Sequence, residues 1–112
     1  MASSLGDFVL NGKVGIVGSG LIGRSWAMLF AAAGYRVSLY DSMPEAVANA
    51  QKLIFDQLRT LSEQGLLRGK LSVDQQYSLV SEAHSLEDCV LNAVYVQECV
   101  PENLDLKRKI FE

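Results

Sequence analysis

The order of apolar and polar positions predicts alternating strands and helices in the first part of the chain. Residues 14–17 form an apolar run with the character of a central parallel strand that is buried on both faces. Residues 21–33 are rich in Ala, Leu and Met, which favours a helix, and Gly34 is placed to end it. Residues 36–41 alternate polar and apolar side chains, as a second strand does. This part of the chain therefore predicts a strand–turn–helix–strand unit.

A long amphipathic helix is predicted next. Apolar residues recur at three- and four-residue steps over residues 47–61, and Gly65 follows the end of this stripe. Pro44 and Glu45 suit the first turn of such a helix, since proline needs no amide partner there and an acid complements the helix dipole.

Shorter elements are predicted in the last part of the chain. Ser72 and Gln75 have the capping-box spacing, which indicates a short helix over residues 73–80. Residues 79–84 are expected to be partly extended, and Ser85 to begin another short helix. Residues 94–100 predict a strand, and residues 104–111 begin a further helix. Residues 1–7 are small and polar and are expected to be a flexible N-terminus before a single unit over residues 8–112.

A glycine motif, Gly18-x-Gly20-x-x-Gly23, lies between the first predicted strand and helix. In such a motif the first glycine allows a tight turn, the second lets a pyrophosphate approach the backbone, and the third lets the helix pack closely. The amide groups of Leu21 and Ile22, in the first helical turn, would then point at the anion. Gly15 lies outside the motif, and its missing side chain is expected only to ease packing.

Asp41 ends the second predicted strand, close to the spacing expected of the acid that binds the adenosine ribose. A carboxylate there repels a 2′-phosphate, so the site favours NAD over NADP.

The fold class that follows is α/β, a Rossmann-type doubly wound parallel sheet with flanking helices, incomplete at its C-terminal end. The alternative is a glycine turn without a ligand. Two roles are equally consistent with the position of Arg24: a contact to the pyrophosphate, or an exposed side chain on the surface.

A second group of polar residues follows the last predicted strand. Glu102 comes just after that strand, and Lys107 lies about one and a half helical turns further on. Their spacing alone favours an acid at a helix N-terminus and a solvated lysine over a ligand site. Glu98 lies in an otherwise apolar strand and requires a partner if it is buried.

Composition and charge exclude several classes of function. The 112 residues carry a net charge of -3 and no evident basic face, which argues against a nucleic-acid partner. No apolar run reaches the roughly 20 residues of a membrane span, and no signal peptide is evident. Cys89 and Cys99 lack the spacing of a metal site and are expected to be core thiols. His84 is the only histidine and is expected to be structural or exposed. A cytoplasmic protein is the expectation.

The segments GIVGSGLIGRSWAMLFAAAGYRVSLYD and VQECVPENLDLKRKIF resemble the 3-hydroxyacyl-CoA dehydrogenase family. The resemblance covers about residues 14–111. It implies that the backbone of the glycine motif and Asp41 hold the adenosine and pyrophosphate half of NAD. It also implies that Glu102 and Lys107 contact the ribose on the nicotinamide side, against the reading from their spacing. The Arg24-Ser25-Trp26 segment departs from the acyl-CoA branch, which has small residues there.

The resemblance implies a reaction but no catalytic residue in this segment. The family removes a hydride from a secondary alcohol carbon and passes it to NAD. The histidine and glutamate that assist it lie beyond this segment in the family, as does a helical second domain. The 112 residues alone are therefore expected to be inactive, and the full-length protein to be a homodimer. A sugar acid is the expected substrate. A hydroxyacyl-CoA and a non-catalytic, lens-type nucleotide-binding protein are the alternatives.

Overall fold

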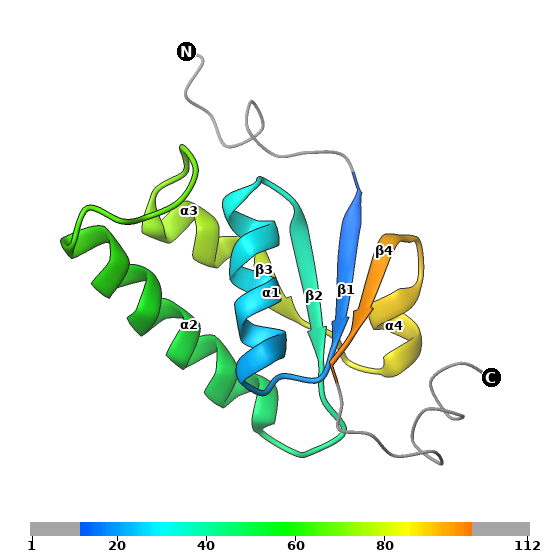
Figure 1. Cartoon of the computed structure of the whole chain (residues 1–112). Helices are drawn as coiled ribbons and strands as arrows, with labels where there is room; N and C mark the ends of the chain where they lie inside the picture. The colour runs from blue at the N-terminus through cyan, green and yellow to red at the C-terminus, as the bar shows by residue number, and fades with distance from the viewer. Residues whose placement is uncertain (1–11, 100–112) are drawn as a thin grey trace.

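The chain folds around a parallel sheet, and the computed structural model describes residues 12–99 (Figure 1). The strands are β1 (Lys13–Val17), β2 (Arg36–Tyr40), β3 (Val80–Glu82) and β4 (Ala93–Glu98). The helices are α1 (Leu21–Ala32), α2 (Ala46–Glu63), α3 (Val73–Ser78) and α4 (Leu86–Val90). Within the described residues the strands have the order β3-β2-β1-β4, and all the pairs are parallel. The carboxyl ends of the strands therefore lie at the same end of the sheet.

Successive side chains of β1 face the two layers of helices in turn. Val14 and Ile16 belong to the core cluster that β1 and β2 share with α1 and α2. Val17 packs in the other direction, in a cluster with Cys89 of α4. A Cβ atom on Gly15 would lie 2.7 Å from the carbonyl oxygen of Cys89, so the glycine allows α4 to approach the strand. The predicted doubly wound sheet, with helices on both faces, is confirmed.

The predicted apolar stripe of the long helix forms most of the contact between α2 and the sheet. Val47, Ala50, Ile54 and Leu58 are buried, and Leu61 packs against the same cluster. The helix begins later than predicted, at Ala46. The amide of Ala46 donates to the carbonyl of Met43 at 3.2 Å, so a turn occupies the two positions that were expected to be helical.

The prediction for the start of α2 was therefore wrong at Pro44 and Glu45. Both residues precede the helix, and Glu45 is its N-cap in a left-handed conformation with φ of 63°. The Glu45 side chain makes no capping hydrogen bond. The physical reason is the tight turn after β2, which includes both residues, so that the first helical hydrogen bond runs from the amide of Asn49 to the carbonyl of Glu45 at 3.1 Å.

The two short helices begin as predicted. Ser72 and Gln75 form both hydrogen bonds of the capping box, and the Ser85 hydroxyl accepts from the amide of Asp88. α3 ends at Ser78, two residues earlier than predicted, because the chain leaves it to pair with β2: the amide of Val37 donates to the carbonyl of Leu79 at 2.8 Å. β4 begins one residue before the predicted strand. Residues 1–7, the end of the predicted strand at residue 100 and the predicted helix 104–111 lie outside the described residues.

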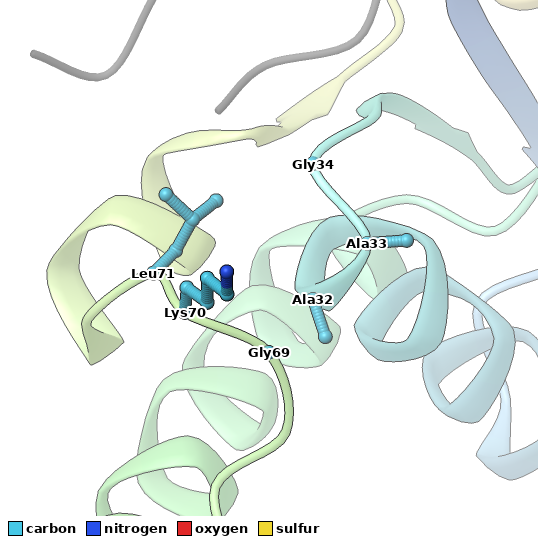
Figure 2. A pocket seen from close by; sticks show the side chains of 6 residues that line it. All are labelled: Ala32, Ala33, Gly34, Gly69, Lys70 and Leu71. Atoms are coloured by element: carbon cyan, nitrogen blue, oxygen red, sulfur yellow. The ribbon is translucent and has the colours of Figure 1, made fainter. Parts of the chain in front are cut away.

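The loop between α2 and α3 packs against the C-terminal end of α1 (Figure 2). Gly69 has φ of +76°, and a Cβ atom there would overlap the carbonyl oxygen of Ala32. The buried Gln76 amide holds this loop by donating to the carbonyls of Arg68 at 2.6 Å and Leu71 at 3.0 Å. A shallow hollow remains beside the contact, lined by Ala32, Ala33, Gly34, Gly69, Lys70 and Leu71. It lies at the opposite end of α1 from the glycine motif.

This contact predicts different costs for two glycines of the same loop. Gly65 and Gly69 both have positive φ, but a Cβ atom on Gly65 would meet nothing within 4 Å. We expect Gly65→Ala to lower the free energy of unfolding by about 1 kcal/mol, the cost of a left-handed alanine. Gly69→Ala should cost about 1–3 kcal/mol more, because Ala32 must move. Urea denaturation of both variants measures the difference, and equal costs would contradict the close contact.

Candidate functional site

The glycine motif forms the turn between β1 and α1 at the carboxyl end of the sheet. Gly18 has φ of 105°, a backbone conformation that residues other than glycine rarely adopt. Its amide donates to the carbonyl of Tyr40, the last residue of β2, at 2.7 Å. The turn is therefore tied to the end of the neighbouring strand, in the crevice where open α/β sheets bind their ligands.

The other two glycines of the motif have different surroundings. A Cβ atom on Gly23 would overlap the carbonyl oxygen of Gly18, so only glycine allows the first turn of α1 to lie this close to the loop. A Cβ atom on Gly20 would meet nothing within 4 Å. Gly20 also has an ordinary extended conformation, with φ of -71°. The fold itself therefore does not require glycine at position 20, whereas a ligand that approaches the backbone does.

The N-terminus of α1 has the properties of an anion-binding site. Gly20 is its N-cap and offers no side chain to the amide groups of the first turn, and no acidic residue lies in that turn. The side chains of Leu21 and Ile22 are 68% and 65% exposed. The amide groups at a helix start have no partner within the helix, and the dipole makes this end positive. An anionic group is therefore favoured here.

Asp41 follows β2 directly and makes three hydrogen bonds. Its Oδ2 accepts from the amide of Ser19 at 2.9 Å and from the hydroxyl of Ser19 at 2.7 Å, while its Oδ1 accepts from the amide of Met43 at 2.9 Å. Burial raises the pKa of this carboxyl. The hydrogen bonds from Met43 and Ser19 together lower it by more than burial raises it, so the pKa lies below its usual value. The carboxylate is therefore charged at neutral pH.

Ser19 is the residue of this site that the sequence did not reveal. It occupies a variable position of the glycine motif, so no pattern marks it. Its 4% exposure makes it a buried polar residue beside the loop. The one available signal was the combination of a hydroxyl residue inside the motif with an acid at the end of the next strand.

Arg24 lies in the first turns of α1, and its side chain is half-buried. Its Nε atom is buried and has no hydrogen-bond partner within residues 12–99.

Glu98 lies beside the start of the glycine loop, whereas two other predicted residues lie outside residues 12–99. Glu98 is half-buried at the carboxyl end of β4, paired with Val17 in the sheet. Glu102 and Lys107 lie outside the described residues, so their contact to the ribose on the nicotinamide side of NAD stays a prediction. His84 is exposed, as expected.

The cysteines follow the expectation of core thiols. Cys89 is buried and Cys99 is half-buried against the core, and neither forms a disulfide. Burial raises the pKa of both thiols. Across residues 12–99, no three His, Cys, Asp or Glu side chains gather in a way that could hold a metal ion. The helices of that same part of the chain are too short or too polar to cross a membrane.

Comparison with known proteins identifies the family. Residues 13–112 match the family described as 3-hydroxyacyl-CoA dehydrogenase, NAD binding domain. The chain belongs to this family. Its cofactor is therefore NAD, and the open backbone at Gly20 with the uncapped start of α1 fits a dinucleotide pyrophosphate. The resemblance that the glycine motif and Asp41 suggested is confirmed at the level of the family.

The similar proteins include lambda-crystallins and dehydrogenases. Lambda-crystallin of Oryctolagus cuniculus is 54% identical over 100 residues, which are 89% of this chain and 31% of that protein. L-carnitine dehydrogenase of Streptomyces griseus is 39% identical, over 88% of this chain and 28% of that enzyme. The crystal structure of 3-hydroxybutyryl-CoA dehydrogenase from Escherichia coli K12 superposes with a TM-score of 0.78 at 27% identity, covering 91% of this chain and 21% of that one. The chain thus spans about a third of the length of the lambda-crystallins.

The surroundings of Gly20 predict a variant that separates binding from folding. Gly20→Ala should lower the free energy of unfolding by no more than about 1 kcal/mol, the cost of alanine at an N-cap, because the added Cβ itself enters open space from an allowed conformation. It should weaken NAD binding at least about tenfold, since the methyl group occupies the side from which the pyrophosphate approaches. Melting without ligand and calorimetric titration with NAD measure the two effects. Unchanged affinity would place the pyrophosphate elsewhere.

Proposed function

We propose that the glycine motif and Asp41 hold the adenosine and pyrophosphate half of NAD. The amide groups of Leu21 and Ile22 donate to the pyrophosphate, with Gly18, Gly20 and Gly23 shaping the loop around it. The Asp41 carboxylate accepts from the adenosine ribose. The observation that carries this proposal is the open space at Gly20. No packing contact in the fold requires glycine at this position, whereas a bound pyrophosphate requires room beside the backbone.

The resemblance to the family extends the proposal to the other half of the cofactor. Glu102 and Lys107 would contact the ribose on the nicotinamide side. Support for this placement comes from β4, whose described end at Glu98 lies at the same end of the sheet as the glycine loop and a few residues before Glu102 in the sequence.

For the full-length protein we propose an NAD-dependent dehydrogenase that oxidises L-gulonate to 3-dehydro-L-gulonate. NAD, when bound, accepts the hydride from the alcohol carbon. The described residues bind and orient the dinucleotide. By the resemblance to the family, the acid–base pair for the alcohol proton lies beyond this segment, and His84, the one histidine of the sequence, is exposed. A cytoplasmic homodimer, which recognises the sugar acid with residues outside this segment, completes the proposal.

The Arg24-Ser25-Trp26 segment, which departs from the acyl-CoA branch of the family, supports the sugar-acid substrate over the alternatives. A 3-hydroxyacyl-CoA is the second candidate, favoured by the structural likeness to 3-hydroxybutyryl-CoA dehydrogenase. L-gulonate, 3-hydroxyacyl thioesters and L-carnitine all carry a hydroxyl on the carbon two bonds from the carboxyl carbon. One reaction type therefore serves all three, and the choice of substrate lies in residues that contact its remaining groups. A nucleotide-binding protein with a purely structural role is the remaining candidate.

The ribose contact predicts both a loss of affinity and a choice of cofactor. Asp41→Ala should weaken NAD binding by about 1–3 kcal/mol, the scale of a hydrogen bond to a charged group. NADP should bind the unmodified protein at least about tenfold more weakly than NAD, because the carboxylate repels the 2′-phosphate. Calorimetric titration tests both, with Asp56→Ala as the control, since Asp56 is an exposed acid on α2. Equal affinities for NAD and NADP would refute the charge argument.

The proposed reaction is tested by following NADH absorbance with the full-length protein. We expect NADH to form with L-gulonate, and at least about tenfold more slowly at equal substrate concentration with 3-hydroxybutyryl-CoA or L-carnitine. The 112 residues alone should form none, since an oriented acid–base pair is missing. A preference for the CoA thioester would establish the second candidate. NAD binding without turnover of any of the three substrates would favour the structural role.

A further inference from the structure

The Ser19 side chain joins the two parts of the proposed cofactor site. It projects from the glycine loop after β1, whereas the carboxylate that it contacts follows β2, 22 residues further along the chain. Its hydroxyl lies 2.7 Å from Oδ2 of Asp41, and its amide lies 2.9 Å from the same oxygen. With the bond between Gly18 and Tyr40, three hydrogen bonds hold the loop to the end of β2.

The pattern of these bonds fixes the orientation of the carboxylate. An ionised carboxylate offers about four acceptor sites, two on each oxygen. Ser19 occupies both sites of Oδ2, and the amide of Met43 occupies one site of Oδ1. One site, on Oδ1, remains for a further donor. No Lys or Arg of the described residues forms an ion pair with Asp41, so these three donors alone determine how the carboxylate is held.

The serine hydroxyl lies on the buried side of the carboxylate. Ser19 is 4% exposed whereas Asp41 is half-buried, so removal of the Ser19 oxygen leaves a gap on the protein side of the charged group. A carboxylate that loses a buried donor turns toward solvent or toward another donor. Its free acceptor site then no longer has a fixed direction.

We infer that Ser19 is a positioning residue for the cofactor: its hydroxyl holds the Asp41 carboxylate so that the free site on Oδ1 faces the adenosine ribose. Ser19 itself does not need to touch the ribose. This inference rests on the proposed role of Asp41. It adds a residue at a variable position of the glycine motif to those that determine how the ribose is recognised.

The test compares two ligands with the full-length protein and its Ser19→Ala variant. One ligand is NAD, and the other is an NAD analogue whose adenosine ribose lacks both hydroxyl groups. We expect Ser19→Ala to raise the Kd for NAD about three- to tenfold and to leave the Kd for the analogue unchanged. Ser78→Ala is the matched control, because the Ser78 hydroxyl also donates to an oxygen acceptor, the carbonyl of Gln75, at 2.7 Å but lies exposed on α3.

Each other outcome overturns the inference in a recognisable way. An equal loss for both ligands would mean that Ser19 acts through the loop and the phosphates. No loss for NAD would mean that the hydroxyl has no part in binding. If the unmodified protein binds NAD and the analogue equally well, Asp41 does not bind the ribose and the proposed function of that residue fails as well. Should Ser19→Ala unfold, Ser19→Cys has nearly the same shape and a much weaker donor, and the same pattern is expected.

A pH profile provides a readout that a loss of structure would not move. The hydroxyl of Ser19 is one of the donors that lower the pKa of Asp41, and its removal raises that pKa. As pH decreases, NAD affinity in Ser19→Ala should therefore begin to fall at a higher pH than in the unmodified protein. Titration of NAD itself is common to both proteins and cancels in the comparison. An unchanged pH dependence would contradict the inference.

Discussion

The close approach of the first turn of α1 to the carbonyl oxygen of Gly18 determines the geometry of the whole site. Only glycine at position 23 permits it, because any Cβ atom there would overlap that oxygen. The approach directs the start of α1 at the end of β1, with the uncapped amide groups open to solvent. The side of Gly20 on which a Cβ atom would lie is open, and the family to which the chain belongs binds NAD.

Hydrogen bonds connect the glycine loop to the residues at the end of β2. The amide of Gly18 donates to the carbonyl of Tyr40, and the amide and hydroxyl of Ser19 donate to the carboxylate of Asp41. The glycine loop and the acid therefore form one connected unit. We infer from this connection that affinity for the adenosine half of NAD depends on a residue that contacts neither ribose nor phosphate.

Most of the fold could be predicted from the sequence because its signals are local. The apolar run of β1 and the stripe of α2 are periodic patterns, and the capping box at Ser72 joins residues three positions apart. All three are present in the structure. The start of α2 could not be predicted in the same way. It depends on a turn in which the amide of Met43 donates to Asp41, and the left-handed Glu45 comes two residues later in the chain. The glycine motif and Asp41 were recognisable by their spacing, whereas Ser19 depends on a contact between distant segments that no spacing rule describes.

The most direct test of the account is a crystal structure of the full-length protein with NAD. The account predicts phosphate oxygens within hydrogen-bond distance of the amide groups of Leu21 and Ile22, against the open side of Gly20, with an adenosine ribose hydroxyl on Oδ1 of Asp41 and the Ser19 hydroxyl still on Oδ2. A pyrophosphate bound away from the N-terminus of α1, or a ribose that makes no contact with Asp41, would contradict it.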